Sequence, residues 1–458
     1  MKSRHIVGSD KWLLQLALAA SAVFALAPVL RASPVDAVGN WNVIALQAAQ
    51  TAGQGPIPQS RTMAIVQVAV HDALNAIDPR YGRYAFKADA PPGASVDAAI
   101  AAAARNALVG AIAVGALPFP QFGTPALQAA ALAQVDAAYA AALAGIPDGL
   151  PKSDGIAVGT AAAAAIVARR SHDHATTFVG YIPGTRPGDW QPTPNPVPFD
   201  PPAAADHLPA ALPGWGHVTP FVLRRSDQFE PDGPPRLSGR RYARDYNEMK
   251  AIGEKNSTTR SDEQSRIARF WYEGATAGWN RIARNVASLR HLDAWDEARL
   301  LALVNLAQAD GAIASFETKY TFNFWRPVTA IRAGDTDGND NTIADPAWES
   351  FLNTPPIPDY TSTHAVLGAA AAEVFRRFFQ YDDVPFTTTS GAPFAGITRS
   401  FSSFSQAARE NGDSRIYAGI HFRAAVDDGI KQGKRIGAFA FTHVLRPLDR
   451  DDDDERER

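Results

Sequence analysis

The chain has 458 residues, 46% of them apolar, and a net charge of −3 at pH 7. This length allows a large buried core in one or two domains, and the near-neutral charge provides no basic field for binding nucleic acid. Because the sequence contains no cysteine, disulfide bonds, thiolate metal sites and cysteine nucleophiles are excluded.

Residues 1–37 have the layout of a signal peptide, with basic residues ahead of an apolar run at 12–30. That order is typical of secretory signals, so we expect export to the periplasm or out of the cell. Cleavage is expected after Ala37, with Ala32 as the alternative point. A retained membrane anchor is the other interpretation, which Pro28 and the short run oppose. We expect no membrane span in the mature chain.

Residues 38–180 form the predicted N-terminal helical region. They are rich in alanine, and prolines separate several helical stretches with little strand-like alternation, which favours a helical bundle. His71 beside Asp72 is interpreted as a buried, hydrogen-bonded helix histidine. His172 and His174 are two residues apart and would not share a helix face, so a polar helix end is favoured over a metal pair.

Residues 181–236 are rich in proline and glycine, which leaves little room for helices. Aromatic residues are interspersed among the prolines, at Trp190, Trp215, Phe221 and Phe229. A flexible linker would not need them. We therefore expect an ordered but irregular segment that wraps the helical body.

Residues 237–447 return to helical patterns and form the predicted catalytic region, and the charged tail at 448–458 is expected to be disordered. The stretch 335–341 resembles part of a calcium loop but lacks the downstream glutamate. A solvated turn is the favoured interpretation there.

Three segments of this region concentrate the chemistry. Their polar residues are Lys319 and Arg326, then Ser362, Thr363 and His364, and finally Arg415 and His421. A lysine, two arginines, two histidines and a hydroxyl, without a cage of carboxylates, suit a tetrahedral oxyanion better than a bare cation. The reason is that guanidinium and ammonium groups make charge-assisted bonds to phosphate-like oxygens.

The spacing within the first and third segments predicts their local structure. Lys319 and Arg326 are seven apart on a predicted helix, so both side chains leave one face about 10 Å apart. A following proline ends that helix near Arg326. Arg415 and His421 are six apart and would lie about 120° apart on one helix. We therefore expect a break near Gly419, with His421 opening the next helix.

The middle segment predicts a proline-rich loop that leads into a helix. Thr361 or Ser362 is a plausible N-cap, which places His364 in the first helical turn. The backbone N–H groups of Ser362 and Thr363 would then be free, where the helix dipole favours an anion.

Together the three segments resemble the signature of the vanadium-dependent haloperoxidase and type-2 phosphatidic acid phosphatase superfamily. That signature is lysine, six residues and Arg-Pro, then Pro-Ser-Gly-His, then Ser-Arg, five residues and histidine. The first and third segments match it in residue type and spacing, whereas the second has Thr361 for proline and Thr363 for glycine. The resemblance covers the last third of the chain and implies an all-α helical bundle of this type, with a Pro-rich irregular segment.

By this resemblance the cofactor is vanadate, and His421 is the axial ligand of vanadium through a neutral imidazole nitrogen. His364 lies across the anion as an acid–base group that titrates near neutrality. With these histidines, Lys319 completes the expected catalytic set. The other groups that would bind the oxyanion, beside Lys319 itself, are Arg326, Ser362, the Thr363 N–H and Arg415.

Further positions bear on the same site by resemblance. Glu273 is expected to brace the site arginines. Ala425 stands where many relatives carry an aspartate near the axial histidine, and Thr363 brings a β-branched side chain that would crowd the anion. Phe316 and Ile357 fall where relatives place residues near the halide, and they do not separate chloride from bromide.

The resemblance implies a haloperoxidase that oxidises halide with hydrogen peroxide to hypohalous acid, and it leaves the organic acceptor open. The same residues suit phosphate, in which case His421 would form a phosphohistidine and His364 would protonate the leaving group, as in a soluble exported acid phosphatase. An inactive oxyanion-binding relative is the third interpretation. The long helical region ahead of the motifs and the lack of predicted spans favour the haloperoxidase.

Overall fold

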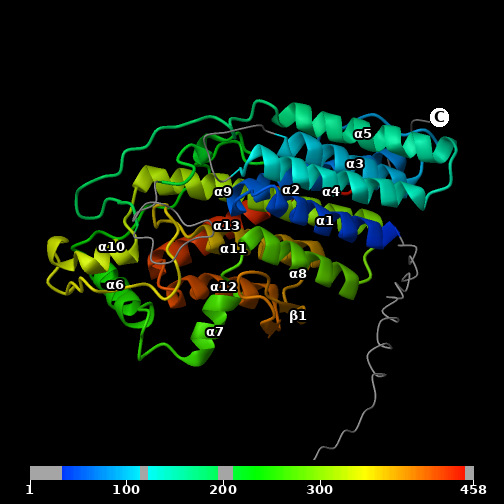
Figure 1. Cartoon of the computed structure of the whole chain (residues 1–458). Coiled ribbons are helices and arrows are strands. Elements are labelled where there is room, and N and C mark those ends of the chain that lie inside the picture. The colour runs from blue at the N-terminus through cyan, green and yellow to red at the C-terminus, as the bar shows by residue number, and fades with distance from the viewer. Residues whose placement is uncertain (1–33, 114–121, 194–209, 449–458) are drawn as a thin grey trace, which may run out of the picture. The chain divides into compact units, whose positions relative to one another are not determined.

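The computed structural model describes residues 34–113, 122–193 and 210–448, and the predicted all-helical fold is confirmed there. Within these ranges the chain forms thirteen α-helices, two short 3-10 helices and one two-stranded antiparallel hairpin (Figure 1). Most of the predicted signal peptide and nearly all of the charged tail lie outside the described residues.

Five N-terminal helices, blue to cyan in Figure 1, form one part of the bundle. They are α1 (Pro34–Thr51), α2 (Pro56–Ile77), α3 (Val96–Ile112), α4 (Pro125–Ala144) and α5 (Leu150–Arg170). All residues from 98 to 104 are buried, because α3 packs against both α2 and α5. Alanine on every side of this helix allows such close contacts, since a helix that is apolar all round belongs in a core.

The longest of the described helices, α9 (Ala294–Phe322), joins the N-terminal helices to the rest of the bundle. Its 29 residues span about 44 Å. It packs against α2 and also against α11 (Thr363–Phe379) and α13 (Arg423–His443). Every residue from 300 to 316 is buried, so the helix is a fixed axis that delivers its C-terminal end to the site.

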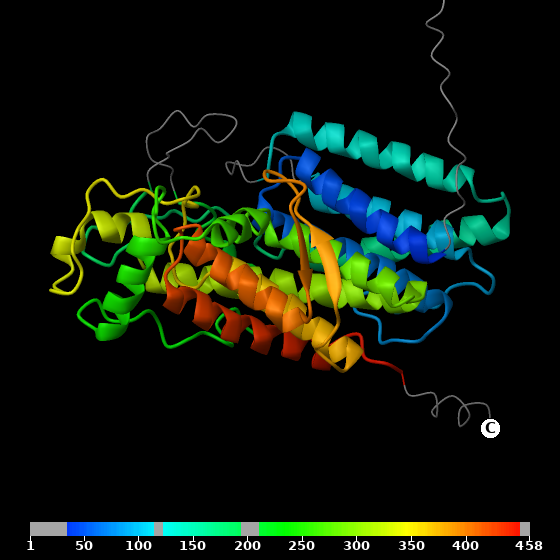
Figure 2. The same cartoon turned by 90° about the horizontal axis from the view of Figure 1, so that it is seen from below.

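The remaining described helices pack against one another or against the helices named above, and a hairpin covers part of them (orange in Figure 2). The helices are α6 (Arg240–Ile252), α7 (Asp262–Phe270), α8 (Ala275–Leu289), α10 (Pro327–Arg332) and α12 (Phe404–Tyr417). The hairpin pairs β1 (Phe386–Thr389) with β2 (Thr398–Phe401) in antiparallel register. The sequence analysis did not predict it, because each strand is only four residues long.

A row of glycines brings α13 against α11. Gly429, Gly433 and Gly437 are four residues apart and face the same partner helix. A Cβ atom at Gly433 would lie 2.1 Å from the carbonyl oxygen of Val366, and one at Gly437 would lie 2.4 Å from that of Ala370. Any side chain would therefore push the helices apart. Their close approach brings the start of α13 beside the start of α11.

The described parts of the irregular segment are tied to the helices, and they include the 3-10 helix η1 (Trp215–His217). Asp310 of α9 is fully buried and binds three consecutive backbone N–H groups at 2.6, 2.7 and 2.8 Å, those of Phe221, Val222 and Leu223. Burial raises the pKa of Asp310 to about 6, although these N–H groups oppose the shift. One carboxylate thus anchors the segment to the central helix.

One helix in the described ranges, α4, has the length and hydropathy of a membrane span, and 17% of that window is buried. Length and composition do not separate a span from a surface helix of a soluble protein. The absence of a span in the mature chain therefore stays a prediction.

Candidate active site

The first segment of the site begins on α9, which is shorter than predicted. The helix ends at Phe322, and Asn323 follows with a left-handed φ of 48°, which asparagine tolerates at a helix end. Arg326 is extended, with φ −83° and ψ 157°, as the N-cap of α10, because the proline after it disfavours helical backbone. The prediction of one helix through Lys319 and Arg326 was therefore wrong.

Lys319 is fully buried and holds the loop that leads into α11. Its Nζ donates to the carbonyl oxygens of Pro358 at 2.8 Å and Asp359 at 3.0 Å, and also to that of Thr361. Burial lowers the pKa of Lys319 well below its ordinary value, and the nearby Arg326 lowers it further. Three acceptors match the three hydrogens of an ammonium group, so this lysine positions the loop in addition to charging the site.

The two arginines are also buried, and backbone carbonyls orient them. Arg326 donates from Nε to Ile357 O at 2.7 Å and from Nη1 to Ile420 O at 2.6 Å. Arg415 donates from Nη2 to Trp271 O at 2.8 Å. Burial lowers the pKa of each guanidinium to about 10, so both remain charged at neutral pH.

Ser362 is the N-cap of α11, as one of the two predicted alternatives had it. Its backbone N–H is not free as expected, because it donates to Ala425 O at 2.9 Å across the close α11–α13 contact. The hydroxyl of Thr363 lies 2.8 Å from the Ser315 hydroxyl of α9. That bond draws the β-branched side chain towards α9.

His364 lies in the first turn of α11, as predicted. Its Nε2 is 3.0 Å from the backbone carbonyl of Glu273. A carbonyl can only accept, so Nε2 carries the hydrogen and Nδ1 is the basic nitrogen. Burial and then Arg415 lower the pKa of His364 to about 3. This pKa lies well below the near-neutral value that was expected.

His421 lies in the turn between α12 and α13, where Gly419 has a φ of +80°. The predicted break is confirmed, but α13 begins two residues after His421, at Arg423. Its Nδ1 is 2.9 Å from Asp359 Oδ1, and its Nε2 is 3.0 Å from Arg326 Nη1. Burial, followed by Arg326 and Lys319, holds the pKa of His421 well below its ordinary value.

Asp359 is a site residue that the sequence analysis missed. It is 1% exposed, and burial raises its pKa to about 7 against the opposing charges of Arg326 and Lys319. The signal was its place three residues before Ser362, inside the second motif. A buried carboxylate in a proline-rich loop needs a hydrogen-bond or ion-pair partner. The sequence does not show which residue that partner is.

The charges of the site do not balance. Lys319, Arg326 and Arg415 are 0%, 0% and 1% exposed, and the positive charge of each lowers the pKa of His421. Among the residues that the structure describes, Asp359 alone forms an ion pair with any of them, at 3.9 Å from Arg326. Uncompensated buried charge is costly, so an added anion would stabilise the site.

Comparison with known proteins agrees with this geometry. A family model of the second helical-bundle domain of vanadium chloroperoxidase matches residues 299–450, which contain all three segments. Vanadium chloroperoxidase of Curvularia inaequalis is 27% identical over 279 residues, 46% of this chain and 45% of that protein. The match thus spans slightly less than half the length of this curated relative.

The crystal structure of the first bacterial vanadium-dependent iodoperoxidase superposes with a TM-score of 0.72 and 26% identity, over 90% of this chain and 97% of that one. The chain belongs to the vanadium-dependent haloperoxidase and type-2 phosphatidic acid phosphatase superfamily. An apo-type bacterial vanadium-dependent chloroperoxidase shares the superfamily fold, with a TM-score of 0.66 and 18% identity over 85% of this chain and 94% of that one.

Glu273 does not brace the site arginines, as the resemblance to the superfamily suggested. Its buried carboxylate pairs with Arg281 of α8 and accepts the Gly391 N–H at 3.1 Å. Because Glu273 lies two residues before the start of α8, an arginine of that helix lies closer than those of the site. Only its backbone carbonyl reaches the site, through His364.

The other candidates from the sequence lie outside this superfamily site. His71 is buried with Nδ1 3.1 Å from Asp72 Oδ1, and Asp72 also accepts three backbone N–H groups of the next loop. His172 and His174 are exposed, and Asp337 accepts bonds from within its own turn. In the described ranges no group of His, Cys, Asp and Glu could hold a metal cation.

Oxyanions are expected to stabilise the folded protein. Orthovanadate or phosphate should raise the unfolding temperature, because an anion that binds only the folded site adds about 2.7 kcal/mol at a concentration 100 times its Kd. Scanning calorimetry at constant ionic strength, with chloride as the reference salt, measures the shift. Arg415→Met should remove it. Arg332→Met should keep it, because Arg332 binds Trp348 O instead. Equal shifts in both variants would contradict an anion site at Arg415.

The low pKa of His364 predicts acid sensitivity. An unfolded histidine titrates near 6.5, whereas folded His364 titrates near 3, so the unfolded state binds more protons between these values. Stability should therefore fall as the pH drops below about 6.5. Urea unfolding at pH 7 and pH 5 should show a loss smaller by about 1–2 kcal/mol in His364→Asn than in the wild type. The exposed His172→Asn serves as the control and should behave as the wild type. A loss in His364→Asn as large as in the wild type would refute the assignment.

Proposed function

We propose that the protein is a vanadate-dependent haloperoxidase that oxidises halide with hydrogen peroxide to hypohalous acid. The observation that carries this proposal is the group of three buried cations around His421 with one carboxylate beside them. The similarity to a vanadium chloroperoxidase and a vanadium-dependent iodoperoxidase supports vanadate as the anion.

The donors of the site fit vanadate. Arg326 Nη2 and Ser362 Oγ are buried without a hydrogen-bond partner among the described residues, and Arg415 adds a second guanidinium. These groups would hold the oxygens of vanadate, and His421 would bind the vanadium through Nε2. When bound, vanadate would supply the Lewis-acid centre that makes hydrogen peroxide electrophilic towards halide.

Lys319 and His364 would act around the bound anion. The Nδ1 of His364 is the basic nitrogen, because its Nε2–H is held by the Glu273 carbonyl, so it can accept or return a proton as peroxide binds. An anion would offset the effect of Arg415 and raise the pKa of this imidazole towards the working pH. Lys319 would add positive charge and hold the loop that carries Ser362.

A phosphatase is the second candidate, and the contact between Asp359 and His421 favours it. A histidine whose Nδ1–H is bound by a carboxylate presents Nε2 as a nucleophile. The phosphoryl group of a phosphate ester in the same site would transfer to Nε2 as its P–O bond breaks, and His364 would protonate the departing alcohol oxygen. Both functions need the same cations, so activity has to separate them.

Purified protein incubated with orthovanadate should halogenate a phenol dye when hydrogen peroxide and chloride, bromide or iodide are present. Phosphate should compete for the site. His421→Ala should lower the rate at least about 100-fold, because the axial ligand and its lone pair are lost. Dye assays against each halide measure the effect, with hydrolysis of a phosphate ester assayed in parallel.

The matched control is His443→Ala, since this exposed histidine lies at the far end of α13. It should keep full activity. Ester hydrolysis without halogenation would favour the phosphatase, and neither activity with undetectable vanadate binding would favour an inactive relative. The assay has to determine the preferred halide. Phe316 is fully buried, and the side chain of Ile357 has no titratable or charged group, so neither residue separates one halide from another.

We also propose export, from the sequence of residues 1–37. Cleavage after Ala37 would remove the first four residues of α1, whereas cleavage after Ala32 would leave that helix complete. The helix therefore favours the earlier point. The intact mass of the mature protein from a periplasmic or culture fraction should match a chain that begins at Ser33. A chain that begins at Val38, or full-length protein retained in the cell, would contradict this.

A further inference from the structure

His421 is held by a carboxylate from another motif. Its Nδ1 lies 2.9 Å from Asp359 Oδ1, and both side chains are buried. Asp359 is also 3.9 Å from Arg326. The shorter distance decides between the two partners, because 2.9 Å is a hydrogen bond and 3.9 Å is not. The carboxylate therefore forms a hydrogen bond with the imidazole of His421 and only a longer electrostatic contact with the guanidinium of Arg326.

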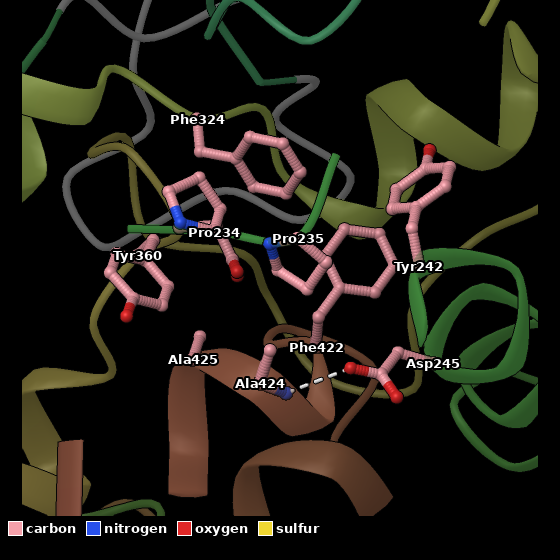
Figure 3. A pocket seen from close by; sticks show the side chains of 10 residues that line it. Pro234, Pro235, Tyr242, Asp245, Phe324, Tyr360, Phe422, Ala424 and Ala425 are labelled. Carbon is pink, nitrogen blue, oxygen red and sulfur yellow. Dashed lines mark hydrogen bonds between the residues drawn. The ribbon is translucent and has the colours of Figure 1, made fainter. Parts of the chain in front are cut away.

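The helix that follows His421 offers no such group at the expected place. Four residues beyond the histidine stands Ala425, which is fully buried at the start of α13. Figure 3 shows Ala424 and Ala425 beside Phe422, and Asp245 of α6 binds the N–H of Ala424 at 3.0 Å. A cavity of about 10 Å³, room for one water, adjoins Ala425, Asp245 and Asp359. Neither Ala425 nor Asp245 contacts the imidazole, whereas Asp359 Oδ1 and Arg326 Nη1 do. A guanidinium can only donate, so Asp359 is the partner that can accept the Nδ1–H.

The backbone of Asp359 is fixed on both sides. Its N–H donates to Phe324 O at 2.8 Å, and its carbonyl accepts from Lys319 Nζ at 3.0 Å. The loop therefore fixes the backbone of this residue, and the N–H of Phe422, the N-cap of α13, also lies against its carboxylate. Because Lys319 also binds the carbonyls of Pro358 and Thr361, the residue that charges the site also sets the position of the carboxylate.

We propose that Asp359 is the positioning residue for His421: it accepts the Nδ1–H, fixes that tautomer, and turns the Nε2 lone pair towards the anion. An unheld imidazole would rotate and exchange its hydrogen between the two nitrogens. Partners of this kind change ligand affinity by about 10–100-fold. This inference rests on the proposed function in one respect, namely that the anion bound at Nε2 is vanadate.

The test uses full-length protein and two measurements. Long-range proton–nitrogen NMR on histidine-labelled protein reports which nitrogen of His421 carries the hydrogen, and His421→Gln identifies its signals among the ten histidines. Calorimetry measures the Kd of orthovanadate. The wild type should show the hydrogen on Nδ1. Asp359→Ala should lose that single tautomer and bind vanadate about 10–100-fold more weakly.

Two further variants separate orientation from packing. Adding Ala425→Asp to Asp359→Ala returns a carboxylate to the imidazole from α13 and should restore both the tautomer and most of the affinity. Asp245→Asn changes another buried carboxylate beside the same cavity and should leave both unchanged. Thermal unfolding verifies that each variant is folded, and Asp359→Asn, which keeps the side-chain shape, replaces Asp359→Ala if that variant does not fold.

The outcomes distinguish this proposal from the proposed function. An unchanged tautomer in the Asp359 variant, or no recovery on adding Ala425→Asp, overturns the positioning role. A wild type with the expected tautomer that binds neither vanadate nor phosphate supports the role of Asp359 and overturns the proposed function. A loss of affinity in Asp245→Asn equal to that in Asp359→Ala would assign the effect to packing and overturn the proposal.

Discussion

The burial of three cations beside one carboxylate is the constraint on which this site depends. Lys319, Arg326 and Arg415 are removed from water, and each of them donates to at least one backbone carbonyl oxygen. Carbonyl groups satisfy donors but do not neutralise charge, and an unpaired buried ion costs several kcal/mol. The rest of the fold offsets that cost, and an anion bound here would meet a positive field that is already in place.

The bundle can hold the three cations close together because each of them comes from a different rigid element. Lys319 lies on the buried helix α9, Arg415 on α12, and Arg326 in a connection pinned by two carbonyls. The glycine row of α13 then brings the His421 turn against the start of α11. Like charges from separate elements would repel one another, and only a core packed on all sides keeps them together.

The spacing of three motifs was enough to predict the superfamily fold, because residue type and order can be read without coordinates. It also identified Arg326, which contacts His421. Orientation was not predictable. The sequence predicted that the helix continues through Arg326, whereas it ends before Asn323, which adopts a left-handed backbone conformation. The N–H of Ser362 was expected to be free, whereas it donates to the carbonyl oxygen of Ala425. Glu273 was assigned to the wrong arginine. Each error concerns a contact between segments far apart in sequence.

The departure at Thr363 shows how such contacts alter the meaning of a motif. A side chain at this place would crowd an anion if it faced the site, but the hydroxyl bonds to Ser315 on α9 instead. A small hydroxyl residue on the neighbouring helix therefore absorbs the change from glycine, and the backbone N–H keeps its place at the first turn of α11. From the sequence alone, Ser315 would be interpreted as an ordinary core residue, because its contact with Thr363 forms only when α9 and α11 pack together.

The loop at 357–361 contacts both the cations of the site and the histidine His421. Its carbonyls bind Lys319 and Arg326, while its one acidic side chain binds His421. The cations and the imidazole are therefore not set independently, because a shift of this loop would move the donors and turn the ring together. A substitution that loosens the loop should weaken anion binding more than the loss of any single hydrogen bond would suggest. Coupling of this kind also explains why a carboxylate here can serve a histidine that belongs to another motif.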